Sequence, residues 1–140
     1  MKRWLVFIVF ISLLSGLYSC NNKPAYPDIS QVSFTLINGN KITMPELRSR
    51  PVLVTFWATS CASCIREIPD LVKLYQQYST QGLEIIAVAM PYDRPDHVLE
   101  FSKARKLPYP VALDVEAKTV RAFGNIRVTP NHFLINPDGD

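Results

Sequence analysis

The sequence predicts an α/β fold in which a mainly parallel central sheet is flanked by helices. Apolar, β-branched runs alternate along the chain with amphipathic stretches of helical spacing. Such alternation favours right-handed βαβ crossovers, which place consecutive strands parallel to one another. The chain of 140 residues is 48% hydrophobic and 19% charged, which excludes a disordered chain, a collagen-like repeat and a coiled coil. We therefore expect a single globular domain.

An N-terminal β-hairpin is the first predicted element. Residues 34–37 and 41–43 have the composition of strands, and Asn38-Gly39 between them suits a tight type I′ turn. Residues 46–51 then form a short polar connection to the central sheet.

The alternating elements follow this hairpin. Residues 52–57 form a continuous apolar run typical of a buried strand, and residues 62–78 show helical spacing with Pro69 predicted to bend the helix. The remaining predictions, in chain order, are a strand at 83–90, a helix at 95–106, a strand at 111–113, a short helix at 115–123 and a strand at 132–136.

The sequence stops on a turn signal, Pro137-Asp138-Gly139. Because a turn normally joins two elements, we expect a closing strand and helix to be missing after Asp140. Residues 30–140 are accordingly interpreted as a C-terminally truncated domain.

Residues 1–19 are predicted to be a secretory signal peptide. Lys2 and Arg3 supply a positive start, and residues 4–14 are apolar apart from Ser12. A retained transmembrane helix is the alternative, but a span needs about 20 mostly apolar residues, and polar residues dilute the second half of this stretch. Loss of Lys2 and Arg3 would reduce the formal charge from +3 to +1, which leaves no electrostatic basis for binding nucleic acid.

Cys20 ends a Leu-Tyr-Ser-Cys segment that resembles the lipobox of bacterial lipoproteins. This resemblance implies that Cys20 carries the lipid, that residues 20–29 form a tether, and that Asn21 favours sorting to the outer membrane. We therefore expect a membrane-anchored protein of the bacterial envelope that faces the periplasm, where disulfides persist.

Cys61 and Cys64 form a CxxC motif between the strand at 52–57 and the following helix. Unpaired backbone N–H groups and the helix dipole favour a thiolate at Cys61, and such sites lower a cysteine pKa from about 8.5 to roughly 3.5–7.5. Cys64 lies one turn deeper on the same face, shielded from solvent. The pattern predicts a redox-active pair in which one sulfur attacks and the other resolves.

Three other interpretations of these cysteines stay open: a structural disulfide, a zinc site, and simple buried thiols, which an oxidising compartment disfavours. A disulfide that only stabilises the fold would not need a helix start, and so short a loop would stabilise little. A zinc site would need two further ligands, for which His97 and His132 are the candidates, at unrelated spacings.

Together with the CxxC, three further segments resemble the TlpA/ResA-type thioredoxin-like family of exported, membrane-tethered thiol–disulfide oxidoreductases. They are Phe-Trp-Ala-Thr at 56–59, Arg-Glu-Ile-Pro at 66–69, and Val-Thr-Pro at 128–130 before Phe-Leu-Ile at 133–135. The resemblance runs from about residue 29 to residue 140. It implies a thioredoxin-like fold and a redox-active Cys61–Cys64 disulfide without other cofactor or metal.

The resemblance also implies roles for individual residues. Cys61 is expected to be the nucleophile and Cys64 the resolving cysteine, with Glu67 assisting proton transfer at Cys64. For Glu67, a solvated helix charge paired with Arg66 or Lys73 is the alternative.

Substrate binding is expected at three other positions, Trp57, Thr129 and Pro130. Pro130 matches the cis-proline of the family, and having no N–H it leaves the Thr129 backbone to pair with an extended substrate. An ordinary trans proline is the alternative for Pro130.

The sequence departs from the family pattern on both sides of Cys61, and from classical thioredoxins at Thr55. Ser60 replaces the tryptophan that usually precedes the first cysteine, and Ala62-Ser63 lacks the common proline between the cysteines. Thr55 stands where classical thioredoxins carry a buried acid, so the proton route cannot be theirs.

The expected function is reduction of protein disulfides, with electrons from a membrane thiol reductant and a role in cytochrome c maturation. The alternative is a Sco-like Cu(I)-binding module that uses His132, although Sco-type proteins have a CxxxC and a differently placed histidine. A peroxidase would need a proline before the attacking cysteine, which this chain lacks.

Overall fold

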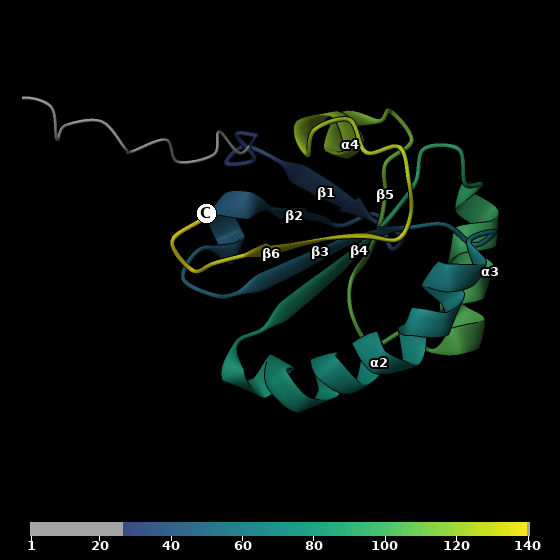
Figure 1. The fold of residues 1–140 in the computed structure, drawn as a ribbon, viewed down its shortest axis with the longest axis horizontal. Helices are drawn as coiled ribbons and strands as arrows, with labels where there is room; N and C mark the ends of the chain where they lie inside the picture. The colour runs from purple at the N-terminus through teal and green to yellow at the C-terminus, as the bar shows by residue number, and fades with distance from the viewer. Residues whose placement is uncertain (1–26, 140) are drawn as a thin grey trace, which may run out of the picture.

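The structure is a computed structural model and describes residues 27–139 (Figure 1). Within these residues a six-stranded sheet has the order β2-β1-β5-β4-β3-β6. The strands are β1 Ser33–Leu36, β2 Lys41–Thr43, β3 Val52–Trp57, β4 Glu84–Ala89, β5 Val111–Leu113 and β6 Asn131–Ile135. The helices are α2 Ala62–Tyr78, α3 Pro95–Arg105 and α4 Lys118–Ala122, with 3-10 turns η2 Met44–Leu47 and η3 Ser79–Gln81.

The centre of the sheet is parallel, as predicted. Strand β4 pairs in parallel with both β3 and β5, and helices α2 and α3 provide the two crossovers. The outer strands make the sheet mixed, because β1 is antiparallel to β2 and β5, and β6 is antiparallel to β3.

The two faces of the sheet bury separate hydrophobic cores. Helices α2 and α3 lie on one side of the sheet in Figure 1 and α4 lies on the other. The α4 side contains Phe34, Phe56 and Phe123, whose rings pack together, the Phe56 and Phe123 centroids lying 5.3 Å apart. The opposite core, under α2 and α3, contains Trp57 and Cys64. The second cysteine of the dithiol is therefore part of a core.

Helix α4 is shorter than predicted. The sequence placed a helix over 115–123, whereas the structure begins it at Lys118. The buried Asp114 carboxylate accepts hydrogen bonds from the Thr119 and Val120 N–H groups at 3.0 and 2.7 Å, and Ala117 is left-handed at φ 56°. Asp114 thus satisfies the first backbone donors of the helix, and the helix begins at Lys118.

The hairpin is present, but its turn is wider than the predicted two-residue type I′ turn. The chain reverses over residues 37–40, and Gly39 alone among them has a positive φ, 85°, whereas type I′ needs positive φ at both central residues. Ile37 donates its N–H to the Val111 carbonyl at 3.0 Å, so the neighbouring strand fixes the first residue of the turn.

The end of the described chain differs from the prediction by one residue. Strand β6 begins at Asn131 and ends at Ile135, rather than running over 132–136.

None of the helices in the described part of the chain is long and apolar enough to cross a membrane. The predicted signal peptide and Cys20 lie outside the described residues, while Ile29, at the end of the predicted tether, packs against the core on the α4 side.

Candidate active site

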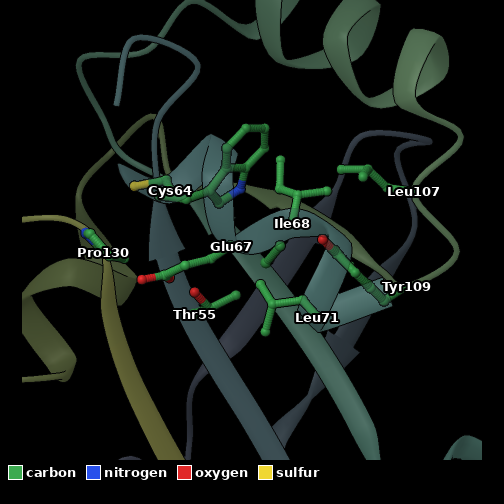
Figure 2. Close-up of a pocket in the computed structure, with 10 residues that line it drawn as sticks. Thr55, Cys64, Glu67, Ile68, Leu71, Leu107, Tyr109 and Pro130 are labelled. Atoms are coloured by element: carbon green, nitrogen blue, oxygen red, sulfur yellow. The ribbon is translucent and has the colours of Figure 1, made fainter. Parts of the chain in front are cut away.

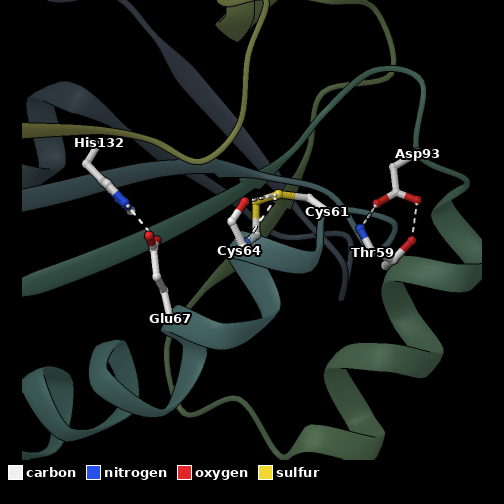
Figure 3. Close-up of a disulfide and its surroundings, with 7 residues drawn as sticks. Thr59, Cys61, Cys64, Glu67, Asp93 and His132 are labelled. Atoms are coloured by element: carbon white, nitrogen blue, oxygen red, sulfur yellow. Dashed lines mark hydrogen bonds and ion pairs between the residues drawn. A yellow bond between two sulfur atoms is a disulfide. The ribbon is translucent and has the colours of Figure 1, made fainter.

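Cys61 and Cys64 lie at the start of α2, just after the buried strand β3. Cys61 is the N-cap residue, and its sulfur accepts a hydrogen bond from the Cys64 N–H at 3.2 Å. The two cysteines form a disulfide, with their Cα atoms 5.3 Å apart (Figure 3). Cys64 is 3% exposed and Cys61 is half-buried. The predicted division between an accessible and a shielded sulfur is therefore present.

Ser63 is a contact of Cys61 that the sequence did not reveal. Its hydroxyl oxygen lies 3.3 Å from the Cys61 sulfur, within hydrogen-bond distance for a sulfur atom. A hydroxyl donor at this position would stabilise negative charge on Cys61 when the pair is reduced.

The loop before Cys61 is fastened to the loop that follows β4. The Asp93 carboxylate accepts hydrogen bonds from the Thr59 N–H at 2.6 Å and from the Thr59 hydroxyl at 2.7 Å (Figure 3). Both residues follow parallel neighbouring strands, so their loops meet at the same edge of the sheet. An acid in the loop after a buried strand was the signal for this contact, but the pairing could not be predicted because the partners are 34 positions apart in sequence.

We expect Asp93→Ala to destabilise the fold by about 1.5–3 kcal/mol, because it removes two charge-assisted hydrogen bonds from a partly buried site. Urea unfolding measures the loss. Asp96→Ala is the matched control, since Asp96 forms an exposed pair with Arg94, and it should leave the unfolding midpoint unchanged. Equal losses in the two variants would contradict a special role for Asp93.

A small cavity of about 10 Å³ lies behind Cys64, between α2 and the sheet (Figure 2). Such a volume holds about one water molecule. The lining is mostly apolar but includes several polar side chains. It comprises Thr55, Trp57, Cys64, Glu67, Ile68, Leu71, Ala87, Leu107, Tyr109 and Pro130. Trp57 is 5% exposed, and its indole nitrogen is buried without a hydrogen-bond partner among the described residues.

Tyr109, which lines this cavity, makes the stability of the fold depend on pH at high pH. Burial raises the pKa of Tyr109 from 10.0 to about 12, because the phenolate loses its hydration. Between these values the unfolded chain releases a proton that the folded chain keeps, so the free energy of unfolding falls as pH rises from 10 to 12. Below pH 10 the contribution of Tyr109 to the free energy of unfolding is fully present.

We expect urea unfolding to show that the free energy of unfolding falls by about 2 kcal/mol between pH 10 and pH 12. Tyr109→Phe should remove it, because phenylalanine keeps the ring and cannot ionise. Tyr92→Phe, at a residue that is 64% exposed, should keep the wild-type slope. An unchanged slope in Tyr109→Phe would show that other groups cause the loss.

Glu67 reaches from α2 toward β6 and meets His132. Its Oε2 atom lies 3.1 Å from the His132 Nε2 atom, and the two side chains are 43% and 38% exposed (Figure 3). The ion pair of Lys73 is with Asp70, at 3.5 Å. Among the described residues, the partner of Glu67 is therefore the imidazole rather than Arg66 or Lys73. This contact could not be predicted from the sequence because Glu67 and His132 are 65 positions apart.

Pro130 faces the dithiol from the loop before β6. The Thr129–Pro130 peptide bond is cis, and Pro130 lines the cavity with Cys64 and Glu67 (Figure 2). Val128, one residue before Thr129, is 70% exposed. The structure thus brings six of the predicted site residues together at one end of the sheet: Trp57, Cys61, Cys64, Glu67, Thr129 and Pro130.

No group of three or more histidine, cysteine, aspartate or glutamate side chains within residues 27–139 is arranged to hold a metal ion. His132, the residue considered for copper, is hydrogen-bonded to Glu67.

Fold and site together define a thioredoxin-like α/β protein with a CxxC pair at the start of a helix. Residues 26–140 match the family model described as the AhpC/TSA family, and the chain belongs to this family. The resemblance to TlpA/ResA-type thioredoxin-like proteins is confirmed by two relatives, both thiol-disulfide oxidoreductase ResA. That of Bacillus subtilis is 33% identical over 73% of this chain and 56% of its own length. That of Halalkalibacterium halodurans is 37% identical over 78% of this chain and 62% of its own length.

Solved structures confirm the thioredoxin-like fold. A thioredoxin family thiol:disulfide interchange protein from Chlorobium tepidum superposes with a TM-score of 0.73 at 26% identity, covering 83% of each chain. StoA from Bacillus subtilis superposes with a TM-score of 0.69 at 25% identity, covering 84% of this chain and 86% of its own. The present chain spans about three-fifths of the length of these ResA relatives.

Proposed function

We propose that this chain is a thiol–disulfide oxidoreductase that reduces protein disulfides through Cys61 and Cys64. The observation that carries the proposal is the placement of the pair: Cys61 caps α2 and is accessible, while Cys64 is 3% exposed beneath it. The ResA relatives support the same chemistry.

The reaction proceeds by two exchanges. The Cys61 thiolate attacks a disulfide of the partner protein, forming a mixed disulfide and releasing one partner thiolate. Cys64 then attacks the Cys61 sulfur, which closes the Cys61–Cys64 disulfide and releases the second partner thiolate. The helix N-terminus stabilises the attacking thiolate, and Glu67, which shares the cavity with Cys64, takes the Cys64 proton. Thr129 and Pro130 support the partner segment beside the sulfurs. Trp57 packs beneath the site, where it lines the cavity with Cys64.

The proposal includes a location. Residues 1–19 direct export, Cys20 carries the lipid, and residues 20–29 tether residues 30–140 to the membrane of the bacterial envelope, with the outer membrane favoured by Asn21. Because no cytosolic thiol pool reaches this compartment, a membrane thiol reductant returns electrons to the oxidised pair. Cytochrome c maturation is the proposed process.

A redox titration of the Cys61–Cys64 couple tests the direction. We expect a potential near that of thioredoxin, about −270 mV, and thiol-dependent reduction of insulin that Cys61→Ser and Cys64→Ser abolish. A potential near that of the oxidant DsbA, about −120 mV, would overturn the reductase assignment. Tight stoichiometric Cu(I) binding without thiol-dependent turnover would favour a Sco-like copper module instead.

A further inference from the structure

The pair of Glu67 and His132 connects the cavity behind Cys64 with the surface of the protein. Glu67 lines that cavity together with Cys64, and its Oε2 atom lies 3.1 Å from the His132 Nε2 atom. Because an ionised carboxylate only accepts, the imidazole nitrogen supplies the hydrogen of this bond. Figure 3 shows His132 pointing from β6 toward Glu67, which points back from α2.

The register of the sheet fixes the position of His132. His132 pairs with Thr55 of β3 in an antiparallel ladder, so the two side chains lie on the same face, toward α2. Thr55 itself lines the cavity. The imidazole is thus held by a strand, whereas a glutamate on a helix surface has several rotamers available.

We propose that His132 is a positioning residue that holds the Glu67 carboxylate at the cavity, where the carboxylate takes the proton of Cys64. This inference rests on the proposed function and on the role given there to Glu67. In the resolving step the Cys64 S–H proton passes to the Glu67 carboxylate, and the Cys64 sulfur bonds to the Cys61 sulfur. The bond between Cys61 and the partner sulfur breaks, and its electron pair leaves on the partner thiolate.

The surroundings of the pair contain few other titratable groups. Among the described residues, Glu67 is the one charged group within ion-pair distance of His132, and the neighbour in register on β3 is Thr55, which does not ionise. On its other side Glu67 shares the cavity with Cys64 and Tyr109.

The test separates the two exchanges by using one equivalent of the aromatic disulfide DTNB on the reduced full chain. All variants carry Cys20→Ser, so that Cys61 and Cys64 are the remaining thiols. The first coloured thiolate is released when Cys61 attacks, and the second when Cys64 resolves the adduct. The first phase therefore reports the nucleophile and the second reports the step assigned to Glu67.

We expect His132→Phe, which keeps a ring but no donor, to slow the second phase roughly three- to tenfold and to leave the first phase unchanged. Glu67→Gln should slow the second phase by about a hundredfold, and the double variant should be no slower than Glu67→Gln. His132→Gln, which keeps a donor, should recover most of the rate at pH 7.

His97→Phe is the matched control, because His97 is the other histidine of the chain and lies exposed on α3. It should match wild type in both phases. Slow resolution in Glu67→Gln with a normal rate in His132→Phe would overturn this inference alone. A normal rate in Glu67→Gln would overturn both the role of Glu67 and this inference, and a wild-type chain that never released the second thiolate would overturn the proposed function itself.

Discussion

Replacing Cys64 with serine leaves Cys61 able to attack a partner disulfide but unable to release the partner, so the covalent complex accumulates. The reason is geometric, because Cys64 is held one helical turn from Cys61, and an intramolecular thiol of this kind has an effective concentration far above any thiol in solution. We expect turnover to fall on the order of 10³-fold or more. Intact-mass measurement after mixing with a disulfide-containing peptide detects the trapped adduct.

Cys61→Ser is the control for this trap, in a Cys20→Ser background for both variants. It should form no adduct, because the remaining Cys64 thiol is 3% exposed and cannot reach a protein disulfide. If Cys61→Ser accumulated the adduct and Cys64→Ser did not, the roles assigned to the two sulfurs would be reversed.

Phe56→Ala is expected to destabilise the domain by about 3–5 kcal/mol, which is a large part of the stability of a typical domain. The Phe56 side chain is fully buried, and its ring packs edge-on against Phe123 at 5.3 Å and Phe133 at 5.9 Å. Truncation therefore removes contacts between β3, β6 and the segment after α4. Urea unfolding followed by circular dichroism measures the change.

Tyr92→Ala is the matched control for the loss of an aromatic ring, because Tyr92 is 64% exposed. It should shift the unfolding free energy by no more than about 0.5 kcal/mol. A loss of less than about 1 kcal/mol in Phe56→Ala would mean that the three rings do not act as one packed unit.

The central elements could be predicted from the sequence because their signals are local. The structure reproduces the predicted bounds of β3, α2 and β5, where a continuous apolar run or a regular helical period leaves one choice of structure. The start of α4 could not be predicted, because Asp114 binds backbone groups five and six residues ahead of it. The hairpin turn was equally hidden, since Ile37 is fixed by a strand far along the chain.

The same distinction applies to the site. The CxxC and its helix start are contiguous in sequence, so the division between Cys61 and Cys64 could be predicted. The partners of Thr59 and Glu67 could not, because Asp93 and His132 come from other strands and loops, 34 and 65 residues away. The pairing of β4 and β6 with β3 brings these groups together.

The pairing of β6 with β3 makes the length of one short segment critical. Pro130 and His132 are two positions apart, and both face α2. Inserting or deleting one residue between them would turn the imidazole to the far side of the sheet, as every one-residue slip in a strand does. Sequence alignments of related proteins should therefore keep this spacing free of gaps, while the residue type at position 132 is free to vary and to set how firmly the neighbouring acid is held.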